Sequence, residues 1–197
     1  MKLIVVTTPT FFVEEDKIIT ALFEEGLDVL HLRKPETPAM YSERLLTLIP
    51  DKYHRRIVTQ AHFYLKEEYN LKGIHLNHRN PIAPDNYTGR ISTSCHSLEE
   101  VKEKKNNFDY VFLSPVFDSI SKQGYAAEYT PEQIRQAAKD GIIDKRVIAL
   151  GGIDEDNILQ VKDYGFGGAA ILGGLWNKFD LDHDYNYQNL IEHFRKL

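Results

Sequence analysis

Eight short apolar runs recur at intervals along the whole chain, and they constrain its fold more than any other feature. The runs are Leu3–Thr7, Val29–Leu32, Arg56–Thr59, Gly73–Leu76, Ile91–Cys95, Tyr110–Leu113, Val147–Leu150 and Ala169–Leu172. Most of them are continuously apolar instead of alternating with polar residues, which is typical of parallel strands that are buried on both faces.

Amphipathic, helix-like segments separate the apolar runs. They cover Glu14–Glu25, Pro38–Pro50, Leu98–Lys105, Pro131–Lys139, Asp154–Tyr164 and Tyr185–Arg195. Before the fourth of these, Thr130 is a suitable N-cap, Pro131 suits the first helical position, and Gln133 can complete a capping box.

This alternation predicts an α/β protein. An open, doubly wound sheet and a closed (β/α)8 barrel both satisfy it, and the count of eight strands favours the barrel. Because the stretch from Asn77 to Arg90 contains Pro81, Pro84 and Gly89, we expect the helix after the fourth strand to be short or missing. No linker or change in composition divides the chain, so one TIM-barrel domain is expected over residues 1–197.

Composition excludes several classes of protein. The formal net charge is −5, whereas a nucleic-acid-binding domain usually carries clustered positive charge. No apolar stretch is long enough to cross a membrane. Cys95 is the only cysteine, so no internal disulfide can form and a reducing compartment is favoured. We therefore predict a cytoplasmic protein that acts on small molecules without nucleic acid or membrane, and a homo-oligomer is compatible with these features.

Polar residues and paired glycines follow several of the predicted strands, where barrel enzymes carry their active sites. The pairs Gly151-Gly152 and Gly173-Gly174 follow the seventh and eighth strands, where barrels often bind phosphate through backbone amides. The segment SPVFDSISKQGY, residues 114–125, follows the sixth strand and offers hydroxyl groups and Lys122. These features predict a phosphate site; the alternative is that the glycines only ease tight turns and that the segment is a polar surface turn.

Six segments, taken in order, resemble the thiamine-phosphate synthase family, whose close relatives include thiazole tautomerases. They are VLHLRK, GIHLN, ISTSCHSLEE, DYVFLSPVFDSISK, VIALGGI and GFGGAAILGGLW. The resemblance implies a (β/α)8 barrel and a transferase of thiamine biosynthesis. Synthases of this family join an aminopyrimidine methyl diphosphate to a thiazole phosphate, use Mg²⁺ and release diphosphate.

The resemblance also implies site residues. Contacts to the thiazole phosphate are expected from Ser119, Ser121, Gly151, Gly152, Leu172 and Gly173, and contacts to the diphosphate from Ser94 and Lys122. Arg33 matches the arginine of the second-strand motif. The expected catalytic residues are His31, Arg33 and Lys122, with Lys34 and Gln60 as further substrate-binding residues.

The chain departs from the family pattern at the metal site. An asparagine–aspartate pair expected after the third strand is Gln60-Ala61, and an acid expected after the fourth strand is Asn80. Mg²⁺ prefers carboxylate and phosphate oxygens. We therefore predict no metal-ligating side chain, Mg²⁺ arriving only with the diphosphate substrate, and weak synthase turnover.

Two other functions remain open at this stage. Thiazole tautomerases also lack these carboxylates, and a histidine at position 31 fits them, but the acid–base histidine expected after the sixth strand is Pro115. The third candidate is a non-catalytic barrel that binds a phosphorylated metabolite. His31 could serve as an acid or base near neutral pH, or as a structural histidine held by hydrogen bonds.

Overall fold

Eight parallel strands form a closed barrel in which each strand pairs with its neighbours in chain order and β8 pairs with β1. The computed structural model describes residues 1–118, 129–180 and 187–197. The strands are β1 Lys2–Val6, β2 Val29–Leu32, β3 Ile57–Thr59, β4 Gly73–Leu76, β5 Arg90–Cys95, β6 Tyr110–Leu113, β7 Val147–Leu150 and β8 Gly168–Ile171. The predicted (β/α)8 barrel is therefore confirmed, with strand boundaries shifted by a single residue at several ends.

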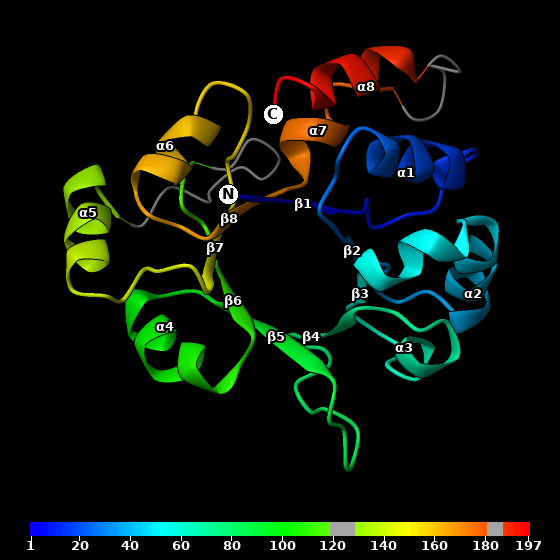
Figure 1. Ribbon diagram of the computed structural model, residues 1–197, viewed down its shortest axis with the longest axis horizontal. Helices are drawn as coiled ribbons and strands as arrows, with labels where there is room; N and C mark the ends of the chain where they lie inside the picture. The colour runs from blue at the N-terminus through cyan, green and yellow to red at the C-terminus, as the bar shows by residue number, and fades with distance from the viewer. Residues whose placement is uncertain (119–128, 181–186) are drawn as a thin grey trace.

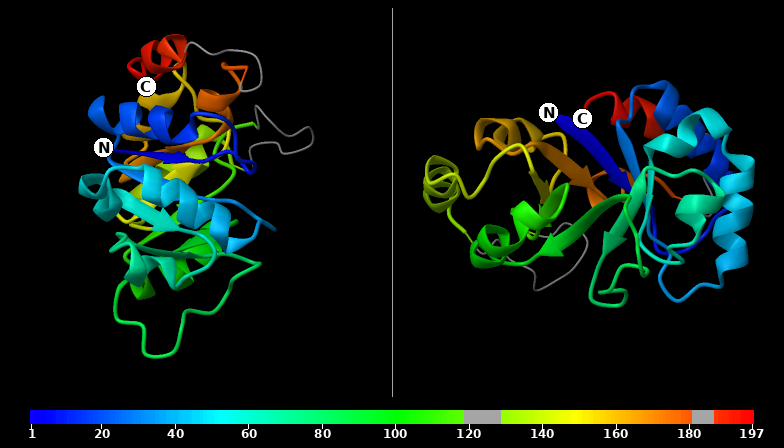
Figure 2. Two further views of the ribbon diagram at one scale, coloured as in Figure 1. Left: turned by 90° about the vertical axis from the view of Figure 1, so that its right-hand side faces the viewer. Right: turned by 60° about the horizontal axis from the view of Figure 1, so that its bottom comes forward.

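Helices surround the barrel (Figures 1 and 2). They are α1 Glu15–Glu24, α2 Ala39–Leu48, α3 Leu65–Glu68, α4 Leu98–Lys104, α5 Pro131–Lys139, α6 Ile158–Asp163, α7 Gly173–Trp176 and α8 Gln188–Phe194, with 3₁₀ turns at Asp51–Arg56 and Lys105–Asn107. The expected capping box is present, because Thr130 Oγ1 accepts from the Gln133 amide and Gln133 Oε1 accepts from the Thr130 amide.

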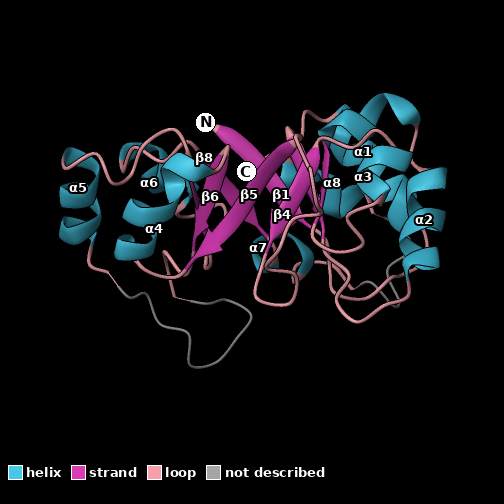
Figure 3. Cartoon of the chain, turned by 90° about the horizontal axis from the view of Figure 1, so that it is seen from below, coloured by secondary structure: helices cyan, strands magenta, loops and turns pink. Residues whose placement is uncertain are grey.

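Two connections bear on the functional site. The segment between β4 and β5 contains no helix, as its prolines predicted, and it forms the loop at the bottom of Figure 1. The short helix α7 was not predicted; it begins at Gly173, directly after β8, and Figure 3 places it below the barrel strands. Trp176 Nε1 donates to the carbonyl of Val6 at 2.8 Å, which ties α7 to the end of β1.

The core has two layers because successive side chains of a strand point to opposite faces. Along β1, Ile4 and Val6 belong to the cluster inside the barrel, whereas Val5 belongs to the larger cluster between the barrel and its helices. Phe112 is the largest side chain of the inner cluster and is 1% exposed. Side chains fill the interior of the barrel, and members of this inner cluster line the base of the cavity described below.

Candidate functional site

A cavity of about 750 Å³ lies at the carboxyl ends of the strands. Strand-end residues around the barrel line it, including Arg33, Gln60, Ser94, Pro115 and Gly151. Phe112 and Ala170 reach it from below, and α7 contributes Gly173 and Gly174. The cavity therefore stands where barrel enzymes carry their chemistry.

The charge of the cavity wall is strongly one-sided. The guanidinium-bearing residues Arg33 and Arg79 line it, and no aspartate or glutamate is among its described lining residues. Cationic and amide-rich walls attract anions, since guanidinium groups pair well with phosphate oxygens. The chain as a whole carries a net charge of −5, so the positive wall is a local feature and not a reflection of composition.

Two buried histidines lie beneath the cavity inside the barrel. Gln60 Nε2 lies 3.1 Å from His31 Nδ1, and His31 Nε2 lies 2.6 Å from the hydroxyl of Tyr110. Because an amide nitrogen is a donor, Nδ1 accepts and the His31 proton sits on Nε2. The His75 ring is bracketed by the hydroxyls of Ser92 and Ser94, each at 2.9 Å.

Burial keeps both rings neutral. It lowers the pKa of His31 well below the ordinary value, with a smaller contribution from the neighbouring His75, and it lowers the pKa of His75 to about 3. His31 is fully buried and does not line the cavity. The ring was expected at the rim as an acid or base; instead it lies below the cavity and contacts Gln60, which does line it.

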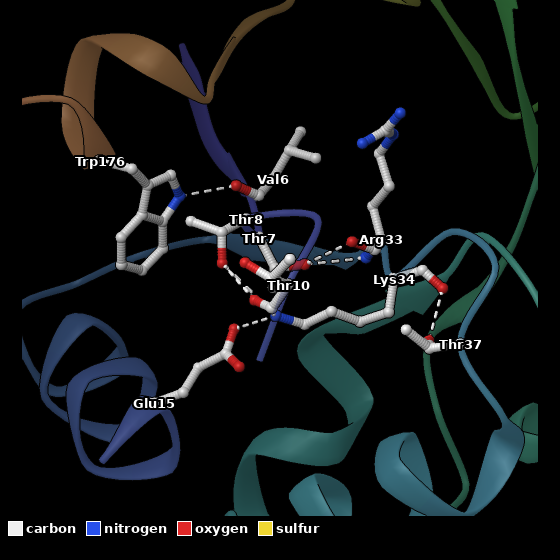
Figure 4. A network of polar contacts seen from close by, with 9 residues as sticks. All are labelled: Val6, Thr7, Thr8, Thr10, Glu15, Arg33, Lys34, Thr37 and Trp176. Carbon is white, nitrogen blue, oxygen red and sulfur yellow. Dashed lines mark hydrogen bonds and ion pairs between the residues drawn. The ribbon is translucent and has the colours of Figure 1, made fainter. Parts of the chain in front are cut away.

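Lys34 and Arg33 follow β2 but point in different directions (Figure 4). The Lys34 ammonium lies 2.6 Å from Glu15 Oε1 and 2.7 Å from the carbonyl of Thr10, with Thr8 Oγ1 at 3.5 Å. The ammonium was expected to bind substrate, but three acceptors of the chain already engage it. Glu15, in the first turn of α1, was missed at the sequence level because an acid there is typical of an exposed helix start.

Glycines shape the wall at the ends of β7 and β8. Gly151 and Gly152 have φ values of 96° and 66°, in the left-handed region that favours glycine. A Cβ atom on Gly152 would stand 2.2 Å from the carbonyl oxygen of Asp118, and one on Gly174 would stand 2.1 Å from that of Ile153. The backbone is thus packed too closely here for any side chain.

The predicted site residues divide into three groups. The structure brings Arg33, Lys34, Gln60, Ser94, Gly151, Gly152, Leu172 and Gly173 together around the cavity. His31 lies below it, and Ser119, Ser121 and Lys122 fall outside the described residues. Arg79 was not singled out from the sequence. It could have been found from its place directly before Asn80, because this chain has a cation beside the position where the family pattern expects an acid.

The cavity does not fit a protein-held Mg²⁺ ion. The two positions where the family pattern expects carboxylates are Ala61 and Asn80, and the Asn80 side chain is engaged in donating to the carbonyl of Gln60 at 3.1 Å. Across the described ranges, no three His, Cys, Asp or Glu side chains are grouped so that they could hold a metal. A hard cation would meet guanidinium groups here instead of oxygen anions.

Comparison with known proteins gives the family. The family model described as thiamine monophosphate synthase matches residues 3–175. The chain belongs to this family. As a thiamine monophosphate synthase family member, it is a transferase of thiamine biosynthesis, in agreement with the resemblance of its motifs.

Relatives agree with this membership. The thiamine-phosphate synthase of Halalkalibacterium halodurans is 29% identical over 163 residues, covering 76% of each chain. A crystal structure of thiamine phosphate pyrophosphorylase from Bacteroides thetaiotaomicron is 69% identical, with a TM-score of 0.91, and the match covers 100% of this chain and 95% of that one.

A more distant structure supports the fold alone. Thiamine phosphate pyrophosphorylase from Pyrococcus furiosus superposes with a TM-score of 0.76 at 19% identity, covering 100% of this chain and 93% of that chain. Within the part of the chain that the structure describes, every helix is too short or too polar to cross a bilayer.

Proposed function

We propose that this chain joins an aminopyrimidine methyl diphosphate to a thiazole phosphate and releases diphosphate. The observation that carries the proposal is the cavity itself: cationic side chains and close-packed glycine backbone meet at the carboxyl ends of the strands, with no acidic side chain among the described lining residues. Both substrates are anionic, so a wall of this charge suits them.

The two anionic groups occupy different walls in this proposal. The thiazole phosphate lies against Gly151, Gly152, Leu172 and Gly173, where glycine lets the backbone approach a ligand closely. The diphosphate lies on the side of Arg33, Gln60 and Ser94. The Ser119, Ser121 and Lys122 segment stays a prediction of the family pattern for closing over these groups.

The reaction needs positive charge where the leaving group departs. The bond between the pyrimidine methylene carbon and the diphosphate oxygen breaks, a bond forms from that carbon to the thiazole nitrogen, and the diphosphate leaves with the electron pair. Cations already fixed in the site stabilise that developing charge without reorganising. Any Mg²⁺ that takes part would come bound to the diphosphate, because the described residues that line the cavity include no carboxylate.

His31 has a positioning role in this scheme. Its Nδ1 holds the amide of Gln60, and Gln60 in turn lines the cavity. The backbone carbonyl of Gln60 also accepts from the side chains of Asn77 and Asn80, at 2.9 and 3.1 Å. The ring thus positions Gln60, a residue of one cavity wall, and does not itself line the cavity.

The names of the family model and of the relatives favour the synthase over a thiazole tautomerase or a barrel that only binds phosphometabolites. A buried free thiol at Cys95 is compatible with our further proposal of a cytoplasmic location without nucleic-acid or membrane partners. A homo-oligomer stays a prediction.

The direct test is incubation of the full chain with both substrates, followed by detection of thiamine phosphate and of diphosphate. We expect the two products in equal amounts, and neither when the thiazole phosphate is left out. Thiazole tautomer conversion without diphosphate release would instead identify a tautomerase. Binding of thiazole phosphate with no turnover of any kind would identify a binding protein.

A further inference from the structure

The cavity wall carries two guanidinium groups and, among its described lining residues, no carboxylate. Arg33 follows β2 and Arg79 follows β4, and both residues line the cavity. Two guanidinium groups carry a charge of about +2 between them, the same as one divalent cation. The anion that enters therefore meets this charge on the protein itself.

Arg33 is held ready for a ligand. Its backbone is fixed to the residue that follows β1, since the Arg33 amide donates to Thr7 Oγ1 at 2.9 Å and Thr7 Oγ1 donates to the Arg33 carbonyl at 3.1 Å. Its side chain is half-buried, yet its guanidinium has no hydrogen-bond acceptor or carboxylate partner anywhere in residues 1–118, 129–180 and 187–197. A half-buried guanidinium that no acceptor of the described protein engages keeps its donors available to an anion that enters the cavity.

Arg79 sits on a turn that is closed by several hydrogen bonds. The side-chain oxygen of Asn77 accepts from the amides of Arg79 and Asn80 at 3.0 and 3.1 Å. The backbones of Asn77 and Asn80 also exchange two hydrogen bonds. These contacts set the direction in which the Arg79 side chain leaves the turn and make it a defined part of the cavity wall.

Arg79 is weakly engaged by the protein. Among the described residues its one ion-pair partner is Glu36, whose Oε1 lies 3.6 Å from Arg79 Nε. The Glu36 side chain is 81% exposed and the Arg79 side chain 42%. Exposed pairs at such a distance contribute little to stability, so an anionic ligand can compete for the guanidinium. The two arginines also feel each other: burial lowers the pKa of Arg33 and the Arg79 charge lowers it further.

We propose that Arg33 and Arg79 together bind the diphosphate group and do so without a divalent cation. This inference rests on the proposed function for the identity of the ligand, and it adds Arg79 to the site. The residues at positions 61 and 80, where the family pattern expects carboxylates, are compatible with two free arginine charges. Carboxylates there would neutralise the guanidinium groups, whereas an alanine and an amide leave both charges available to phosphate oxygens.

The test is calorimetry of inorganic diphosphate binding to the full chain in EDTA, repeated with millimolar Mg²⁺. We expect binding in EDTA, with an affinity that falls as salt is raised. Arg79→Ala should weaken binding in EDTA by about tenfold to a hundredfold, the range for a hydrogen bond to a charged group. Arg79→Lys should recover part of the loss because the charge remains without the fork of donors.

Arg135→Ala is the matched control, because Arg135 is an exposed arginine on α5 that pairs with Glu132 at 3.3 Å, much as Arg79 pairs with Glu36, and does not line the cavity. It should bind diphosphate as the wild type does. Binding that appears only with Mg²⁺, or an Arg79→Ala variant that folds normally and binds undiminished in EDTA, would overturn the proposal. Thiamine phosphate formation is measured separately: its absence alongside Arg79-dependent binding would remove the proposed reaction but leave the anion site standing.

Discussion

The Lys34 ammonium and Glu15 Oε1 form a 2.6 Å ion pair in which the two side chains are only 1% and 2% exposed. The pair joins the end of β2 to the first turn of α1, across the loop that follows β1 (Figure 4). Glu15 Oε2 is also buried and has no hydrogen-bond partner among the described residues. Burial raises the pKa of Glu15 to about 7, although Lys34 opposes the shift, and burial lowers the pKa of Lys34.

Lys34→Met should destabilise the protein more at pH 8 than at pH 5. At pH 8 it leaves an uncompensated buried carboxylate, at a cost of about 3 kcal/mol, whereas at pH 5 a proton neutralises Glu15. Adding Glu15→Leu should recover much of the loss, since apolar replacements of buried pairs are often neutral. Urea unfolding measures the stability of the wild type, of Lys34→Met and of the double variant. As a control, Glu14→Gln removes the exposed ion pair of Glu14 with Lys17 and should not change stability at either pH. Equal losses at both pH values would contradict the assigned burial of the carboxylate.

Glu15 should also impose a pH dependence on the wild type. Its pKa rises from the ordinary 4.5 to about 7 on folding, so the folded state binds more protons between these values. The free energy of unfolding therefore falls as the pH rises through that window, with a slope of up to about 1.4 kcal/mol per pH unit. The Glu15→Gln variant should lack this component. Stability profiles of wild type and variant that run parallel from pH 4.5 to 7 would refute the raised pKa of Glu15.

His75 should act in the opposite direction. Its pKa falls from the ordinary 6.5 to about 3 on folding, so between these pH values the unfolded chain binds more protons than the folded state. Stability should therefore fall as the pH drops below 6.5, again by up to about 1.4 kcal/mol per unit for this group. The His75→Gln variant should show a shallower acid limb, and the His75 ring protons should not shift by NMR from pH 5 to 8. A titration of the ring in that range would disprove the neutral assignment.

Gly152→Ala should damage both stability and thiazole phosphate binding. The added Cβ would meet the Asp118 carbonyl at 2.2 Å, and φ is 66°. Gly141→Ala is a matched control, because Gly141 has a φ of 71° but no atom within 4 Å of the added carbon. We expect about 1 kcal/mol of strain at Gly141 and a larger loss at Gly152, with weaker ligand binding only for the latter. Equal effects in calorimetry and thermal unfolding would show that close contact at Gly152 is unimportant.

Ala61→Asp combined with Asn80→Asp should create an Mg²⁺ site where the wild type has none that binds at sub-millimolar concentration. The two positions line the same cavity, and Asn80 already reaches the carbonyl of Gln60 next to Ala61. Calorimetry with Mg²⁺ alone reads out the new site. Diphosphate binding should then depend on the metal, because the new carboxylates compete for the arginines. Tight Mg²⁺ binding by the wild type would show that a substitute ligand has been overlooked.

The sequence by itself determined the alternation of eight buried strands with helices, and the count of eight favoured a closed barrel over an open sheet. Runs that are apolar throughout suit strands buried on both faces of a parallel sheet, and this rule acts through local patterns. Local chemistry also predicted the capping box at Thr130 and the missing helix between β4 and β5, since prolines and caps act within a few residues. The glycine pairs marked one wall of the cavity for the same reason.

Only the tertiary structure decided which polar groups meet. Lys34 and Glu15 are 19 residues apart, and nothing local separates a buried acid in a first helical turn from the usual exposed one. The same holds for His31, whose place beneath Gln60 depends on the pairing of β2 with β3 and on Tyr110 across the barrel. Arg33 and Arg79 share a cavity because closing the barrel brings the ends of β2 and β4 to one rim. Burial and charge depend on such long-range neighbours, which local sequence patterns do not encode.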